Sequence, residues 1–370
     1  MFETNTVHTD HKDIIHDVQY DYYGIRFATC SSDQIIKIFD KQDNGEWICT
    51  ANWRGHSGSV WRLSWAHPEF GQVLASCSFD RTVSVWEESL GEKSNQALTP
   101  PTRRWVRKTN LVDSRTNVTD CKFGPKHLGL LIATTSADGF IRIYEAPEIT
   151  NLSQWTLQHE IDCKLALSCI SWNNSLYRLH APMIAAGSDS NQGGGVGKVF
   201  IFEYSENARR WVRTETINSV TDEVHDLAFA PSLGRSFHTL AVGSKDLHIF
   251  NLKPILDSSS SNRFEIQPAQ QLINETQVVP DRGIEPRIWR VSWNVTGTLL
   301  AATADDGYVR LWKQNYLKSW RCVCIFAPQS QAHIFQEPLS QGSNDKGNNT
   351  RTTQYFKRGT ITHPNQVPWH

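Results

Sequence analysis

A short pattern of apolar and small residues recurs six times along this chain of 370 residues. In each copy an apolar residue precedes Ala and further small residues, a polar turn follows, and the segment ends as apolar-x-apolar-aromatic. Because residues two apart on a β-strand share one face, the pattern predicts two antiparallel strands joined by a tight hairpin. The six copies are 27–39, 74–86, 132–144, 184–202, 240–250 and 300–312.

Two further extended segments accompany each copy, so each repeat has four predicted strands. An apolar-x-aromatic run precedes it, and a Trp-led segment follows it in five cases, with Phe264 at the sixth. An Asp recurs in each hairpin, and the steps between these Asp residues run from 47 residues (33 to 80) to 60 residues (246 to 306). Four-strand repeats of about this length are typical of WD-repeat propellers with loop insertions.

The sequence therefore predicts an all-β fold, a six-bladed WD-repeat β-propeller over residues 1–327. Beyond residue 328 the composition changes to Gln, Asn, Ser, Gly and Thr without the repeat, which predicts a disordered polar tail over 328–370. The blades are expected near residues 10–54, 55–110, 111–160, 161–217, 218–273 and 284–327.

The strand count leaves one segment over. Residues 2–8 are β-prone, although all six blades already have an outer strand, the last over 320–326. The extra strand could displace the last outer strand and close the ring, belong to a seventh blade that this chain does not finish, or be a frayed N-terminal arm. An unfinished blade would leave open strand edges, which favour pairing with another chain.

Composition narrows the classes of function. The formal net charge is −1, so bulk electrostatics predicts no direct contact with nucleic acid. No apolar run approaches the ~20 residues that span a bilayer, and residues 1–20 lack the apolar core of a signal peptide, so we expect a soluble intracellular protein without membrane insertion. The eight cysteines are scattered over the repeats and are expected to be reduced core residues.

No constellation of residues predicts catalysis. His11 and His56 each lie seven residues before an inner strand, and we expect them to bond to a turn or an Asp of their own blade rather than act as bases. The chain has no nucleophile elbow, phosphate-binding Gly-rich loop or His-Glu-x-x-His motif, and Cys322-x-Cys324 lacks a second metal-binding pair. We therefore predict no enzyme, no catalytic residue, no cofactor and no metal.

The run over 56–62, followed by 65–81, resembles the Sec-thirteen group of WD-repeat proteins. The segments 111–116, 151–155, 229–238 and 289–293 are similar to the nucleoporin branch of that group, and the resemblance covers about 10–326. It implies an open six-bladed propeller in which a helical scaffold partner donates strands that complete a seventh blade. It also implies a non-enzymatic scaffold subunit of the nuclear pore outer-ring Y-complex, which supports pore assembly and transport of mRNA and protein.

The resemblance implies particular partners and places. In the nuclear pore the partner would be a nucleoporin-eighty-five type scaffold, together with other Y-complex nucleoporins. A second assembly, the GATOR complex, regulates amino-acid signalling to TORC1 at the lysosome surface, and its Mio-type subunit would be the partner there. Family members are also found at kinetochores in mitosis.

We expect partner strands to enter between the first and last blades, held by backbone pairing and apolar burial. Two alternative functions are a coat-vesicle propeller at the endoplasmic reticulum and a ubiquitin-ligase substrate receptor. The receptor class is disfavoured because the Arg expected two residues after a strand-ending Trp-Asp is absent after Phe39, Trp86 and Trp312. The predicted partner-binding residues are Phe2, Val7, Ile14, Ile15, Val18, Tyr20, Tyr308, Val309, Leu311, Trp320, Val323 and Ile325.

Overall fold

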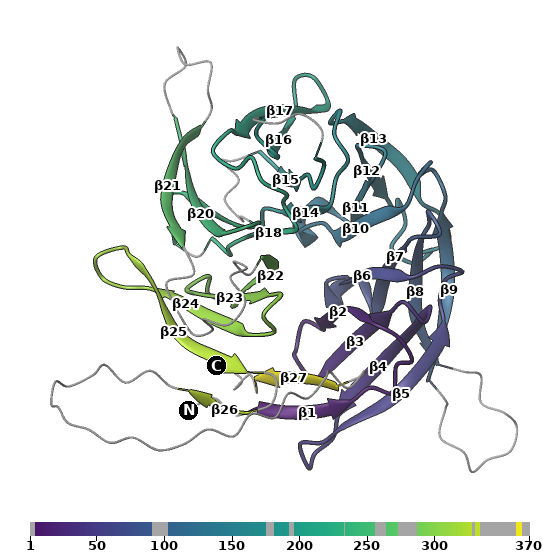
Figure 1. Ribbon diagram of the computed structural model, residues 1–370. Helices are drawn as coiled ribbons and strands as arrows, with labels where there is room; N and C mark the ends of the chain where they lie inside the picture. Colours follow the sequence, from purple (N-terminus) through teal and green to yellow (C-terminus); the bar gives the residue numbers. More distant parts are fainter. Residues whose placement is uncertain are drawn as a thin grey trace, which may run out of the picture.

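The computed structural model describes residues 4–90, 103–174, 181–191, 196–232, 234–255, 264–272, 287–327, 330–333 and 360–364. Within these residues, six antiparallel sheets follow one another around a common axis (Figure 1). A separate two-stranded sheet pairs β1 (Thr4–His8) with β27 (Thr360–Pro364). The all-β, six-bladed propeller that the sequence predicts is confirmed.

The first three blades each have four strands whose order in the sheet follows the chain. Blade 1 contains β2 (Ile15–Tyr20), β3 (Arg26–Ser31), β4 (Ile35–Lys41) and β5 (Trp47–Arg54). Blade 2 contains β6 (Val60–Trp65), η1 (Pro68–Phe70), β7 (Val73–Ser78), β8 (Val83–Leu90) and β9 (Arg103–Leu111). Blade 3 contains β10 (Val118–Phe123), η2 (Lys126–Leu128), β11 (Leu131–Ser136), β12 (Phe140–Glu145) and β13 (Thr156–Asp162).

The last three blades repeat this order, with one addition. Blade 4 contains β14 (Cys169–Trp172), β15 (Met183–Gly187), β16 (Val199–Ser205) and β17 (Arg210–Ile217). Blade 5 contains β18 (Asp226–Phe229), β19 (His238–Gly243), β20 (Leu247–Pro254) and β21 (Phe264–Leu272). Blade 6 contains β22 (Ile288–Trp293), β23 (Leu299–Ala304), β24 (Val309–Gln314), β25 (Trp320–Ala327) and a fifth strand, β26 (Ser330–His333).

The structure places two short strands within the segment predicted to be a disordered tail. β26 pairs with the outer edge of β25, and β27 pairs with β1, although both strands lie beyond residue 328. An alternating Thr-Ile-Thr run at 360–362 is β-prone, and an unpaired strand edge offers it backbone hydrogen bonds. Residues 328–329, 334–359 and 365–370 lie outside the described residues.

The recurring hairpin places small residues opposite branched ones. Ala28 of β3 lies opposite Ile38 of β4, and Ala75 of β7 lies opposite Val85 of β8. All four side chains are fully buried. The short Ala side chains leave room where neighbouring blades converge, and the branched partners fill the space between them.

The two histidines hold the hairpin turns of their own blades, as the sequence predicts. In blade 1, His11 contacts Asp33 through Nδ1 at 2.9 Å and Thr29 through Nε2 at 2.9 Å. In blade 2, His56 makes the equivalent contact with Asp80 at 3.0 Å. Both imidazoles are therefore engaged within their blades.

Apolar contact joins each blade to the next. Blades 1 and 2 share a buried cluster, and so do blades 2 and 3, 3 and 4, 4 and 5, and 5 and 6. In every case, one face of the earlier blade meets the opposite face of the later blade. Each internal blade therefore buries both of its faces, which is the main apolar stabilisation of such a repeat array.

Hydrogen bonds between inner strands follow two alternating patterns. In the first, an Asp carboxylate accepts from a backbone N–H of the next blade at 3.0 Å: Asp17 from Leu63, Asp120 from Ile170, and Asp226 from Val291. In the second, a Ser hydroxyl oxygen accepts instead: Ser64 from Phe123 N–H at 3.0 Å and Ser171 from Phe229 N–H at 3.1 Å. The Asp pattern joins blades 1–2, 3–4 and 5–6, and the Ser pattern joins blades 2–3 and 4–5.

Buried charges meet among the inner strands. Arg62 lies 3.4 Å from the Asp226 carboxylate and 4.0 Å from that of Asp120. Burial raises the pKa of Asp120, although Lys122 and Arg62 oppose this effect. Burial also works against the charged form of Asp17, yet cations that include Lys122 and Arg62 hold its pKa below the ordinary value. The carboxylates that bridge the blades therefore depend on a few buried cations.

Replacement of Arg62 with Met should destabilise the propeller by about 3–5 kcal/mol, because it leaves Asp120 and Asp226 buried without their shared cation. The free energy of unfolding from a denaturant titration measures this loss. The matched variant Arg321→Met, at an exposed position on β25, should stay within about 0.5 kcal/mol of the parent. Equal stability of both variants would show that the buried charges do not hold the blades together.

Candidate functional site: the seam between the first and last blades

The seam is the place where blade 6 would meet blade 1, and no buried apolar cluster among the described residues spans it. On blade 1, the face toward the seam carries four aromatic side chains. Phe27 stacks on Phe39 at 4.8 Å, and both Tyr20 and Trp47 contact Phe27 edge-on, at 5.6 and 4.7 Å. Burial raises the pKa of Tyr20 to about 12.

These aromatic residues occupy positions that contact a preceding blade elsewhere in the ring. On blade 2 the equivalents of Phe27, Phe39 and Trp47 are Leu74, Trp86 and Trp105. The blade 2 residues pack into the cluster shared with blade 1. Blade 1 therefore directs toward the seam the face that the other blades use to contact their predecessor.

Blade 6 directs its other face toward the seam. Leu311, Cys324 and Phe326 form a small buried cluster there, with Ala301 and Val309 packed against it. The residues at the same positions of blade 2, such as Val83 and Val85, belong to the cluster shared with the following blade. In blade 6, the cluster contains no residue of blade 1.

The alternating hydrogen bonds also stop at the seam. Ser292 follows Val291 and precedes Trp293, as Ser64 and Ser171 follow and precede residues of the same kinds in blades 2 and 4. Those two serines accept a backbone N–H from the next blade. Ser292 is exposed, and no residue in the described part of the chain donates to its hydroxyl oxygen. It is an acceptor placed for a strand of a following blade.

Among the described residues, a direct hydrogen bond crosses the seam close to the axis. The guanidinium Nη2 of Arg290 on β22 donates to the backbone carbonyl of His16 on β2 at 2.7 Å. Arg290 is also one of the cations that lower the pKa of Asp17. This long polar side chain links the inner ends of the two blades without an apolar contact between their faces.

The extra N-terminal strand lies at this place in the ring. In the view of Figure 1, β1 and β27 run between the first and last blades. Their antiparallel register sets Thr4 opposite Pro364 and His8 opposite Thr360. β25 keeps its pairing with β24, so β1 does not displace the last outer strand, and its pairing with β27 excludes a frayed arm over Thr4–His8. The two termini together supply two strands beside the seam.

The structure spreads the predicted partner-binding residues over several environments. Tyr20, Ile15 and Val18 lie on β2, half-buried, whereas Ile14 is 67% exposed. Val7 lies on β1 opposite Ile361 of β27. Phe2 lies outside the described residues.

In blade 6, the predicted residues divide between the two faces. Val309 and Leu311 lie in the cluster that faces the seam. Tyr308 stands beside them with its ring 5.8 Å from the Arg310 guanidinium carbon, while Val323 is 40% exposed and Ile325 is buried on β25. Trp320 differs from these residues, because its side chain packs into the cluster shared with blade 5. The repeat pattern would have predicted this orientation, since the equivalent Trp105 also faces the preceding blade.

Sequence reasoning missed the aromatic pair Phe27 and Phe39, Phe326 and the acceptor Ser292. The apolar-Ser-Trp run recurs at 63–65, 170–172 and 291–293 and would have singled out Ser292. The described residues contain no group of three or more side chains that could hold a metal ion, and none of their helices is long and apolar enough to cross a membrane. All eight cysteines are free thiols. The seam therefore offers strand edges, apolar faces and a hydroxyl acceptor.

The fold and the seam define a WD-repeat propeller whose first and last blades lack a shared apolar interface. The family model "WD domain, G-beta repeat" matches residues 3–40, 47–87 and 282–313. The chain is 56% identical over 352 residues to the protein named nucleoporin SEH1 of Bos taurus, covering 94% of this chain and 93% of that protein. It is 57% identical to nucleoporin SEH1 of Homo sapiens and 58% identical to that of Xenopus tropicalis, with 88% of each chain covered. The chain belongs to the SEH1 nucleoporin family.

Removal of residues 334–370 deletes β27 and should expose the backbone of β1. We expect the amide protons of Thr6–His8 to exchange at least about tenfold faster, because their cross-strand hydrogen bonds are lost. Hydrogen exchange followed by mass spectrometry measures this change. Strands β3 and β4 serve as the internal control and should keep their rates. Unchanged exchange in β1 would contradict the pairing of the two termini.

Proposed function

We propose that this protein is a non-enzymatic scaffold subunit of the nuclear pore outer-ring Y-complex, and that it binds by accepting partner strands at the seam. The membership of the SEH1 nucleoporin family supports a role in the nuclear pore. The observation that carries the mode of binding is the interruption of the interblade contacts at one place. Five pairs of blades share an apolar cluster, while the faces of blade 6 and blade 1 do not.

A donated blade would satisfy both faces at once. Phe27 and Phe326 are buried in this structure, at 1% and 5% exposed, so an incoming sheet would replace the groups that now cover them. One side of that sheet would pack on Leu311, Val309 and Phe326, and its other side would pack on the aromatic face around Phe27 and Tyr20. A backbone N–H of its innermost strand would donate to Ser292. Apolar burial would supply most of the free energy of binding, and the strand edges would fix the register.

The β1–β27 pair sets a condition on this binding. β27 occupies one edge of β1. A partner strand must therefore either replace β27 or pair with one of the two outer edges of this two-stranded sheet. We propose that β1 is the part of the seventh blade supplied by this chain and that the partner supplies the rest. In the nuclear pore this partner is a helical scaffold of the nucleoporin-eighty-five type, alongside other Y-complex nucleoporins.

The same seam serves a second assembly in this proposal. A Mio-type subunit would donate strands in the GATOR complex, which regulates amino-acid signalling to TORC1 at the lysosome. Both partners must occupy the same faces and the same acceptor, so one propeller can join only one of them at a time. The proposed locations are the nuclear envelope, the lysosome surface and, in mitosis, the kinetochore.

The variant Ser292→Ala should weaken capture of the scaffold nucleoporin by about fivefold, because one buried hydrogen bond contributes about 1 kcal/mol. Titration of the purified propeller with the scaffold segment measures the dissociation constant. The control Ser171→Ala removes the same kind of bond between blades 4 and 5, so it should lower the stability of the propeller and leave capture unchanged. Equal capture by Ser292→Ala and the parent would remove Ser292 from the interface.

Deletion of residues 1–8 should weaken capture more than it destabilises the propeller. The deletion removes β1, which the proposal assigns to the seventh blade, but it leaves the carbonyl groups of Thr9 and Asp10 that accept hydrogen bonds from Lys37. Copurification with the scaffold and the unfolding midpoint are the two measurements. Undiminished copurification would contradict the role of β1. Recovery of coat-vesicle or ubiquitin-ligase subunits in place of nucleoporins would contradict the proposed function itself.

A further inference from the structure

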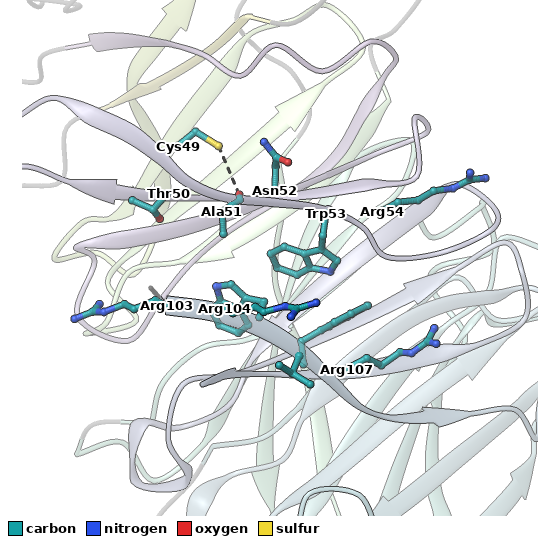
Figure 2. A pocket seen from close by; sticks show the side chains of 12 residues that line it. Cys49, Thr50, Ala51, Asn52, Trp53, Arg54, Arg103, Arg104 and Arg107 are labelled. Atoms are coloured by element: carbon teal, nitrogen blue, oxygen red, sulfur yellow. Dashed lines mark hydrogen bonds between the residues drawn. The ribbon is translucent and has the colours of Figure 1, made fainter. Parts of the chain in front are cut away.

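A groove between the outer strands of blades 1 and 2 forms a second distinctive surface, away from the seam. Its volume is about 860 Å³, and β5 and β9 line its two sides (Figure 2). Four arginines contribute to it: Arg54 from β5, and Arg103, Arg104 and Arg107 from β9. All four side chains are exposed. In Figure 2, Arg54 and Arg107 extend toward one end of the groove and Arg103 toward the other.

The positive charge of this groove is not balanced locally. No carboxylate in the described part of the chain forms an ion pair with any of the four guanidinium groups. The nearest acidic residues along β8 are already engaged, because Glu87 pairs with Lys108 at 2.7 Å and Glu88 pairs with Arg26 at 2.8 Å. The residues that connect β8 to β9, 91–102, contain one Glu and one Lys. They cannot neutralise four cations.

The floor of the groove is aromatic. Trp53 stacks on Trp105 at 5.7 Å and lies 5.3 Å from Trp86. The Arg107 guanidinium carbon lies 6.0 Å from the centre of the Trp86 ring, which orients this cation along the groove. Figure 2 shows Trp53 pointing from β5 toward β9. The indole N–H of Trp53 is buried and has no hydrogen-bond partner in the described part of the chain.

The outer strands of blades 3 and 4 do not repeat this arrangement. In blades 3 and 4 the corresponding strands are β13 and β17, which contact each other. β17 carries the exposed arginines Arg210 and Arg213, but β13 contains no arginine and carries Glu160 and Asp162, which pair with Arg142 and Lys164. The charge between these two blades is therefore mixed. The groove between blades 1 and 2 differs from this pair because both of its strands contribute arginines.

The edges of the outer strands can also bind the backbone of a peptide. β5 and β9 are the outermost strands of their four-stranded sheets, so each has one unpaired edge. An extended peptide can pair with such an edge. Arg103 and Arg107 lie four residues apart on β9, about 13 Å along the strand, so carboxylates four residues apart on an extended peptide match this spacing.

We propose that this arginine groove binds an extended acidic peptide segment of another protein. Carboxylates of the peptide pair with Arg103, Arg104, Arg107 and Arg54, and an apolar side chain lies on Trp53. Charge complementarity selects this occupant, because exposed guanidinium groups bind carboxylates in a two-pronged geometry. The groove lies on the outer rim and leaves the seam accessible, so both surfaces can be occupied together.

Fluorescence anisotropy with the full-length protein tests this proposal. The probe is a fluorescein-labelled peptide of alternating Glu and Val, and the same peptide with Lys in place of Glu is its control. We expect saturable binding of the acidic peptide that weakens as salt rises from about 0.05 M to about 0.3 M, because exposed ion pairs are screened. The double variant Arg104→Glu/Arg107→Glu should lose at least about tenfold in affinity, and Arg104→Gln/Arg107→Gln should lose less.

A control double variant distinguishes the effect of the groove residues from the effect of a change in net charge. Arg210→Glu/Arg213→Glu makes the same change of charge on the outer strand of blade 4, where Arg213 also stacks on an aromatic ring, Phe200, at 5.4 Å. It should change the affinity by less than about twofold. Equal losses in the two double variants, equal binding of the Lys peptide, or no saturable binding would each overturn the proposal. Tighter binding of single-stranded oligodeoxythymidine than of the acidic peptide would also overturn it, because the groove would then favour nucleic acid.

Discussion

A blade of this propeller has two apolar faces, and each face must be covered by a neighbouring sheet. Within the chain this condition is met five times, where the Ala-rich second strands and the branched third strands contribute to the clusters between successive blades. Among the described residues, blade 6 and blade 1 share no such cluster, and Arg290 reaches across to the backbone of His16. The proposed function follows from this missing contact between blades, because a sheet from another protein can lie between them and pack on both faces.

The polar contacts between blades also join each blade to the next and stop at the seam. Asp and Ser acceptors alternate around the inner strands and receive backbone N–H groups of the next blade, which fixes the rotation from one blade to the next. The series ends at Ser292, which lies at an acceptor position with no following blade in this chain. An acceptor that is already correctly oriented lowers the entropic cost of ordering a partner strand.

Much of this architecture could be predicted from periodicity. The alternation in 27–39 and its five repeats predicts the hairpins, and the six-bladed propeller follows from their number. The division of residues between blade faces was harder to predict, because Trp320 and Val323 are close in sequence yet differ in exposure, from 4% to 40%. A β-bulge between Leu311 and Trp312 interrupts the alternation at this point. The pairing of β1 with β27 could not be predicted, because it joins the two ends of the chain and depends on contacts of very long sequence separation.

Blade 1 takes part in both proposed surfaces. Its aromatic face, with Phe27 and Phe39, is directed toward the seam, and its outer strand β5 carries Arg54 and Trp53 at the arginine groove. The first surface is apolar and would require a folded partner sheet, whereas the second is charged and suits a short extended segment. One scaffold protein could therefore hold a stable partner and a more readily exchanged one at the same time.

The most direct test is a structure of this protein bound to its scaffold nucleoporin. The account predicts that partner strands lie between β2–β5 and β22–β25, that they cover Leu311 and Phe27, and that a partner backbone N–H lies within hydrogen-bond distance of Ser292 Oγ. A partner bound elsewhere, with the seam faces uncovered and the β1–β27 pair unchanged, would contradict it.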